Sequence, residues 1–144
     1  MSGVSQLPET PNVATPIEVM FFDTDCAAVV HNIAYLRFIE TARTHLAAQM
    51  GMSLRTMSEA KEYPVVVRTE IDYRSPAVLG DRLEVRGALE KMERSRFWCS
   101  FQIVRLADEK VIVTCRQMLA LISMPSAKVL RLPAAWLQKY DHLR

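Results

Sequence analysis

A short stretch near the N-terminus gathers most of the side chains that could carry out chemistry. It holds two carboxylates at Asp23 and Asp25, a thiol at Cys26, an imidazole at His31 and an amide at Asn32. A carboxylate can attack a substrate directly or act as a general base toward water. A long segment with helical periodicity follows at once, so the stretch predicts a site at the N-terminus of a helix.

Each of these side chains also has a simpler structural interpretation. Asp25 could cap the following helix or turn, as aspartate before a helix often does. Asp23 is more typical of a carboxylate that accepts local backbone N–H groups. Cys26 with His31 as its base would be a second possible nucleophile, but their spacing across a turn is weak evidence. A small packed thiol is therefore the preferred interpretation of Cys26.

The elements that must position this stretch are a strand before it and a helix after it. The apolar spacing predicts a helix over 33–50, with Gly51 as its stop, and a shorter helix over 53–61. Alternating apolar residues predict five strands and a Pro-initiated final helix over 135–143. The strands are 17–22, 63–73, 82–92, 96–106 and 111–124, the last four being expected to follow one another as hairpins. This order predicts an α+β fold with an antiparallel sheet.

Length and composition restrict the class of protein. At 144 residues the chain has the size of one domain, and we expect a flexible tail over 1–16 and a single domain over 17–144. A net charge of +2 without a basic stripe argues against a nucleic-acid partner. No segment predicts a membrane span or a secretory signal. Three separated cysteines without a Cys-x-x-Cys pair predict no disulfide framework and no metal site, and hence a reduced, cytoplasmic protein.

The motifs, taken with the order of the elements, resemble a known family. They are similar to the hot-dog-fold acyl-CoA thioesterases of the 4-hydroxybenzoyl-CoA thioesterase type, above all to the Tol-Pal-associated bacterial subgroup. The resemblance covers roughly residues 17–124, and in two places this chain departs from it. The family usually has Gly at the position of Ala28 and His or Tyr at the position of Asn32. The residues that carry the resemblance are 23–35, Phe38 to Arg43, Val66 to Arg68, Tyr73 to Ala77 and Leu79 to Asp81.

The resemblance implies both a fold and an activity. The fold would be a hot-dog, a five-stranded antiparallel sheet wrapped around one long helix. The activity would be hydrolysis of an acyl-CoA to a free acid and CoA, with no cofactor because CoA is part of the substrate. The pocket of such enzymes forms between subunits, so a homodimer or homotetramer is implied.

The resemblance also implies roles for individual residues. Asp25 would be the nucleophile or general base, and Asn32 would donate its amide to the thioester oxygen or to Asp25. Backbone N–H groups around 30–32, at the positive end of the helix, would polarise the carbonyl. The substrate would contact Val30, His31, Tyr35 and Arg68, and the turn between the third and fourth strands would bind the CoA phosphates through Arg94, Ser95 and Arg96.

Several alternatives stay open at this stage. Tyr35 could belong to the core, and the turn at Arg94 could be an ordinary solvated hairpin. An acyl-carrier-protein thioesterase would use the same chemistry on another carrier. A non-catalytic acyl-CoA-binding or assembly module would keep the scaffold alone. A hot-dog dehydratase would need a catalytic histidine, for which His31 is a poor candidate.

Overall fold

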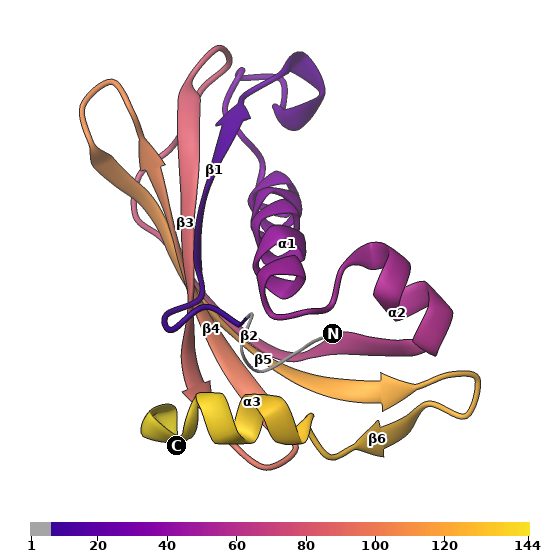
Figure 1. Ribbon diagram of the computed structural model, residues 1–144. Coiled ribbons are helices and arrows are strands. Elements are labelled where there is room, and N and C mark those ends of the chain that lie inside the picture. Colours follow the sequence, from indigo (N-terminus) through magenta and orange to yellow (C-terminus); the bar gives the residue numbers. More distant parts are fainter. Residues whose placement is uncertain (1–6) are drawn as a thin grey trace.

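The computed structural model describes residues 7–144 as one curved antiparallel sheet with a long helix on one face (Figure 1). Within these residues, no helix is long and apolar enough to cross a membrane. The helices are α1 (Asn32–Gln49), α2 (Leu54–Ala60) and α3 (Ala134–Lys139), with short 3-10 turns at Phe21–Asp23 and Asp141–Leu143. The strands are β1 (Asn12–Glu18), β2 (Glu62–Tyr73), β3 (Arg82–Met92), β4 (Arg96–Arg105), β5 (Lys110–Ser123) and β6 (Lys128–Leu130).

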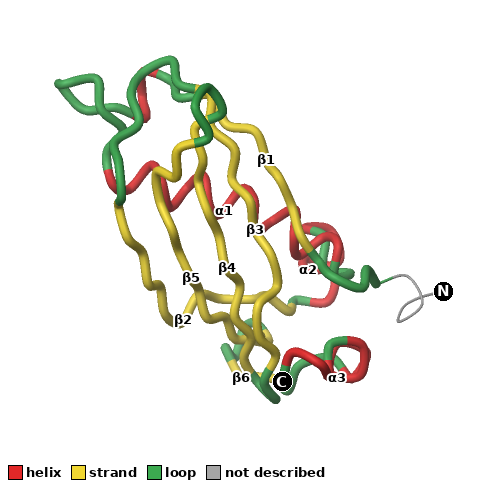
Figure 2. Tube along the Cα trace, turned by 90° about the vertical axis from the view of Figure 1, so that its left-hand side faces the viewer, coloured by secondary structure: helices red, strands yellow, loops and turns green. Residues whose placement is uncertain are grey.

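The sheet has the order β1-β3-β4-β5-β2, with β6 paired to the end of β5. Figure 2 shows the five long strands side by side with α1 behind them. The expected hairpins β3–β4 and β4–β5 are confirmed. The expected β2–β3 hairpin is wrong, because β2 pairs with β5 at the far edge, from Glu62 opposite Ser123 to Tyr73 opposite Val113. The loop of residues 74–81 then crosses to β3.

Helix α1 forms because its apolar residues recur every three to four positions and meet the concave face of the sheet. Its buried residues are Ala34, Tyr35, Phe38, Ile39, Ala42 and Leu46. They pack on inward-facing strand residues such as Val85, Phe101 and Ile103 to form the core. The helix ends where Gly51 adopts a left-handed backbone with φ 86°, as the sequence predicts.

The first strand lies earlier in the chain than expected. β1 spans Asn12–Glu18 and pairs with β3, so residues 12–16 belong to the sheet and not to a tail. The prolines of this segment were the reason for predicting a tail. Pro16 is nevertheless compatible with a strand, because β1 is at an edge of the sheet. The part of the expected tail over residues 1–6 lies outside the described residues.

The sheet has six strands and not the five predicted, because the short β6 pairs with β5 after the turn at residues 124–127.

The alternation along β2 also differs from the prediction. A bulge between Val66 and Arg68 shifts the register, so Val65 and Val67 do not share one regular face. After the bulge, Thr69, Ile71 and Tyr73 face α1, while Arg68 and Glu70 face the other side.

The C-terminal segment closes the end of the core opposite the N-terminus of α1. Trp136 is buried, donates its indole N–H to the Met50 carbonyl at 2.8 Å and packs edge-on against Phe97. The Tyr140 hydroxyl donates to the Pro8 carbonyl at 2.9 Å. These bonds hold α3 beside the β3–β4 turn at the lower end of the molecule (Figure 1).

Candidate active site

Asp25 forms a compact turn just before α1. Its Oδ1 accepts the backbone N–H groups of Ala27 at 2.9 Å and Val29 at 3.4 Å. Its backbone N–H donates to the Val29 carbonyl at 3.0 Å. The carboxylate is exposed, and its Oδ2 has no hydrogen-bond partner among residues 7–144. Asp25 therefore caps its own turn and not the helix, whose N-cap is His31, and it keeps one oxygen available for chemistry.

Ala28 closes this turn in an unusual backbone conformation. Its φ is 59°, in the left-handed region that favours glycine. The carbonyl of Ala28 accepts the N–H of Leu79 at 3.0 Å. The turn thus has the shape for which glycine is best suited, although alanine occupies the position.

The turn is attached to the crossover loop of residues 74–81. Val30 donates its N–H to the Ala77 carbonyl at 2.9 Å, and Val29 and Val78 form a bridge. His31 donates its N–H to the Asp23 carbonyl at 3.1 Å. The N–H groups of Val30 and His31 are therefore occupied, contrary to expectation.

The first two residues of α1 have the unpaired N–H groups at the helix start. The backbone N–H groups of Asn32 and Ile33 have no acceptor within the described part of the chain. Unpaired donors of this kind are typical of a helix start, where the helix dipole places about half a positive charge. Of the expected donors, only the N–H of Asn32 is unpaired among residues 7–144, and Ile33 adds one that was not expected.

Asp23 has the structural role that was expected of it. It is buried, and its Oδ2 accepts the backbone N–H of Met20 at 2.9 Å. Its other oxygen lies 3.6 Å from Nη2 of Arg37 on α1. This carboxylate fixes the chain entering the Asp25 turn and is not available to a substrate.

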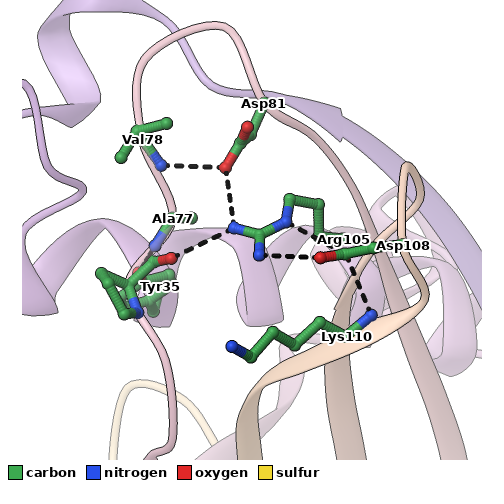
Figure 3. Close-up of polar contacts among 8 residues, drawn as sticks. Tyr35, Ala77, Val78, Asp81, Arg105, Asp108 and Lys110 are labelled. Carbon is green, nitrogen blue, oxygen red and sulfur yellow. Dashed lines mark hydrogen bonds and ion pairs between the residues drawn. The ribbon is translucent and has the colours of Figure 1, made fainter.

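Tyr35 and Arg105 hold the crossover loop in place (Figure 3). The Tyr35 hydroxyl accepts the backbone N–H of Ala77 at 3.1 Å. Arg105 Nη1 lies 3.4 Å from both the Pro76 carbonyl and Asp81 Oδ2. Burial raises the pKa of the Tyr35 phenol, which therefore stays protonated at neutral pH. The sequence interpretation missed Arg105, because no local pattern relates it to a loop that precedes it by more than twenty residues.

A cavity of about 260 Å³ lies between the start of α1 and this loop. It brings together three of the predicted site residues, Val30, Asn32 and Tyr35. The strand β2 and the crossover loop complete its wall. The additional lining residues are Val29, Tyr73, Arg74, Ser75 and Pro76.

The remaining predicted residues do not line this cavity within one chain, and Asp25 is joined to it only through Val29 of its own turn. Arg68 faces the side of the sheet opposite α1 and pairs with Glu70 at 3.0 Å. The turn of Arg94, Ser95 and Arg96 lies at the other end of β3 (Figure 1). Since each strand residue advances the chain by about 3.4 Å, that turn is roughly 35 Å from the start of β3. His31 is half-buried at the N-cap of α1.

The thiols divide into one exposed and two buried groups. Cys26 is exposed, so its expected role as a packed thiol is wrong. Cys99 and Cys115 are buried in the core, where desolvation raises their pKa to about 12 and about 11 respectively. The two buried thiols are therefore protonated and unreactive at neutral pH.

Comparison with known proteins agrees with this architecture. A family model described as the thioesterase-like superfamily matches residues 19–140. The acyl-CoA thioesterase YbgC of Haemophilus influenzae is 30% identical over 105 residues, which cover 69% of this chain and 77% of the relative. The 1,4-dihydroxy-2-naphthoyl-CoA hydrolase of Synechocystis is 26% identical over 120 residues, which cover 83% of this chain and 87% of the relative.

A solved structure of a thioesterase also has a similar fold. The crystal structure of Slr0204, a 1,4-dihydroxy-2-naphthoyl-CoA thioesterase from Synechocystis, matches with a TM-score of 0.78 at 25% identity. The match covers 92% of this chain and 97% of that one. The predicted hot-dog fold is confirmed, and the chain belongs to the thioesterase-like superfamily.

Proposed function

We propose that this protein hydrolyses an acyl-CoA thioester to a free acid and CoA, with Asp25 as nucleophile or general base. One observation carries the proposal: a free carboxylate oxygen and two unpaired backbone N–H groups flank the same short turn beside a cavity. The relatives named as acyl-CoA thioesterases and hydrolases support this reaction. Within the superfamily, we assign the chain to the 4-hydroxybenzoyl-CoA thioesterase type, in its Tol-Pal-associated subgroup.

The free Oδ2 of Asp25 permits two routes. As a general base, the carboxylate takes a proton from water while the water oxygen attacks the thioester carbon. The tetrahedral intermediate then breaks its carbon–sulfur bond, and the proton passes to the departing CoA thiolate. As a nucleophile, Asp25 itself displaces the thiolate to give a mixed anhydride, which water then hydrolyses.

Both routes place negative charge on the thioester oxygen. The N–H groups of Asn32 and Ile33 are the donors best placed to stabilise it, because they are unpaired and lie at the positive end of α1. Asn32 lines the cavity, and its side chain offers an amide donor. It cannot act as a base, so the proton transfer is left to Asp25.

The CoA portion requires a second copy of the chain. Arg94, Ser95 and Arg96 suit the phosphates of CoA, since guanidinium groups bind phosphate in two-point fashion. They lie roughly 35 Å from the Asp25 end of their own protomer. We therefore propose a homodimer or homotetramer in which this turn serves the Asp25 of a partner, in a cytoplasmic enzyme that needs no metal or redox cofactor.

The test is hydrolysis of a panel of aromatic and aliphatic acyl-CoAs by the wild type and by Asp25→Asn. We expect a loss of at least about 100-fold in kcat, as is typical when a general base is removed. Asp141→Asn is the matched control, because Asp141 is an exposed aspartate near the C-terminus. Full activity in Asp25→Asn would overturn the assignment of this residue.

The same panel separates the alternatives. Faster turnover of matched acyl-carrier-protein substrates would favour an acyl-carrier-protein thioesterase. Binding of acyl-CoA without hydrolysis of any panel member would favour a non-catalytic binding module.

A further inference from the structure

Helix α1 leaves part of the sheet uncovered. It packs over β1 and β3, and the side of β2 that faces it stays open. We call Val66, Thr69, Ile71 and Tyr73 the uncovered strip; Val66 is 39% and Tyr73 is 48% exposed. Tyr73 also lines the active-site cavity, so the strip leads from that cavity along β2.

A chain of polar side chains lies beside this strip. Arg43 of α1 donates from Nη1 to Gln117 Oε1 at 2.6 Å. Gln117 Nε2 in turn donates to Thr69 Oγ1 at 3.3 Å. Gln117 is one of three buried polar residues in the described chain, and its exposure is 3%. A polar network thus interrupts an otherwise apolar core and reaches the surface at Thr69.

This network has hydrogen-bond donors that the protein does not use. A guanidinium carries five N–H donors, and Nη1 of Arg43 makes the only hydrogen bond of this group with residues 7–144. The Glu40 carboxylate is 3.6 Å from Nη2 and largely exposed. Thr69 is exposed and can donate its hydroxyl proton while accepting from Gln117. The unused capacity of the network therefore favours a ligand that supplies acceptor oxygens.

The space beyond Arg43 is closed. A cavity of only about 20 Å³, lined by Arg43 and apolar groups including Leu46, Phe97 and Trp136, lies behind it. This volume holds about one water-sized group. An acyl group that reaches the network from the strip therefore has no room to extend past Arg43 into the core.

The length of such an acyl group follows from the backbone. Asn32 and Arg43 are eleven residues apart on α1, which corresponds to roughly 16 Å along the axis. A long helical side chain leans toward the N-terminus, which shortens this separation. Thr69 and Tyr73 are four residues apart on β2, or roughly 13 Å. Whether measured along α1 or along β2, the distance from the active site to the network corresponds to an acyl length of about 10 to 15 Å.

We propose that Arg43, Gln117 and Thr69 form a specificity site for a hydroxyl or carboxylate oxygen at the far end of the acyl group. This inference rests on the proposed function, because it places the thioester carbonyl at the N-terminus of α1. Burial lowers the pKa of the Arg43 guanidinium by desolvating its charge. An acceptor oxygen of the substrate would restore part of the lost solvation.

The experiment compares decanoyl, ω-hydroxydecanoyl and decanedioyl groups, which differ only at the far end. Binding of the three free acids is measured by calorimetry, and kcat/KM is measured for the three CoA esters. We expect the wild type to favour the oxygenated groups about tenfold, as for one hydrogen bond to a charged group. Arg43→Met should abolish this preference, so that the three groups have equal affinity and equal kcat/KM in the variant.

Two further variants make the test decisive. Thr69→Val replaces an exposed strand residue by one of the same shape, so it keeps the fold and should weaken the preference about threefold, as for loss of one neutral hydrogen bond. Arg55→Met is the matched control, because Arg55 is an exposed arginine on α2. Equal binding of the three acids by the wild type overturns the site, and so does a preference that survives both Arg43→Met and Thr69→Val.

The two proposals fail in different ways. A binding preference without hydrolysis of any CoA ester removes the proposed function and keeps the specificity site. Hydrolysis of all three esters at equal rates, with equal binding of the acids, keeps the function and removes the site.

Discussion

The Tyr35 hydroxyl accepts the backbone N–H of Ala77 at 3.1 Å, and the carbonyl of the same Ala77 accepts the N–H of Val30 at 2.9 Å. One residue of the crossover loop thus joins the body of α1 to the turn that carries Asp25. Ala77 itself is fully buried. The position of the carboxylate therefore depends on a side chain ten residues further along the chain.

Tyr35→Phe removes this hydroxyl and leaves the buried N–H of Ala77 without an acceptor. An unsatisfied buried donor costs about 1 to 3 kcal/mol of unfolding free energy, and we expect a loss in that range by denaturant unfolding. Thioester hydrolysis should fall as well, because the Asp25 turn loses its support. Tyr63→Phe is the control, since Tyr63 makes no hydrogen bond through its hydroxyl in the described chain. Unchanged stability in Tyr35→Phe would show that the bond is dispensable.

Ala28→Gly should stabilise the protein. An L-residue with a side chain in the left-handed region costs about 1 kcal/mol relative to glycine, and Ala28 has φ 59°. The expected gain in unfolding free energy is about 1 kcal/mol, with thioester hydrolysis retained. The neighbouring Ala27 does not have a positive φ, so Ala27→Gly should bring no gain. A destabilised Ala28→Gly would mean that the turn has another conformation in solution.

Local patterns in the sequence predict much of this fold, because they report on local physics. The spacing of apolar residues predicts α1, Gly51 predicts its end, and Asp23 is assigned correctly to a structural role. Pairing between distant segments is different: nothing near Tyr73 indicates that β2 would pair with β5. The separation of Arg94 from Asp25 and the contact of Arg105 with Pro76 follow from that topology. Arg105, which the sequence interpretation missed, is positioned by a distant part of the chain.

The three thiols should react differently with an aromatic disulfide reagent at neutral pH. Cys26 is exposed and should react in the native protein, while Cys99 and Cys115 should react only after unfolding. Burial raises the pKa of these two thiols to about 12 and about 11. Raised pKa values mean that the folded state holds its protons more tightly than the unfolded state. The contribution of the two buried thiols to the free energy of unfolding is full below the ordinary thiol pKa of about 8.5. It is lost as the pH rises toward their pKa values in the folded protein.

The check is a thiol count in native and unfolded protein, followed by unfolding midpoints at rising pH. Cys26→Ser should abolish the native reaction and leave the stability profile unchanged. Fast reaction of more than one thiol in the native protein would contradict the burial of Cys99 and Cys115.

Arg105→Met should act on catalysis through the crossover loop without touching the substrate. Arg105 lies 3.4 Å from the Pro76 carbonyl and from Asp81 Oδ2, which also accepts the N–H of Val78 at 3.0 Å. Without the guanidinium, the loop should move more freely, and Val30 at the Asp25 turn should move with it. A displacement of about 1 Å at a reacting group can cost about 100-fold in rate, so we expect a fall in kcat of about tenfold, for a loosened turn, with KM little changed.

Amide hydrogen exchange distinguishes this positioning role from general destabilisation. Exchange of the Val30 and Leu79 N–H groups should accelerate in Arg105→Met, because both bonds join the Asp25 turn to the loop. Exchange in the middle of β4 and β5 should not change. Arg105→Lys keeps the charge and should recover part of kcat. Arg82→Met is the control and should have no effect, because Arg82 is an exposed arginine at the start of β3, directly after the loop. If Val30 stays equally protected while kcat falls, Arg105 acts on the reaction by some route other than this loop.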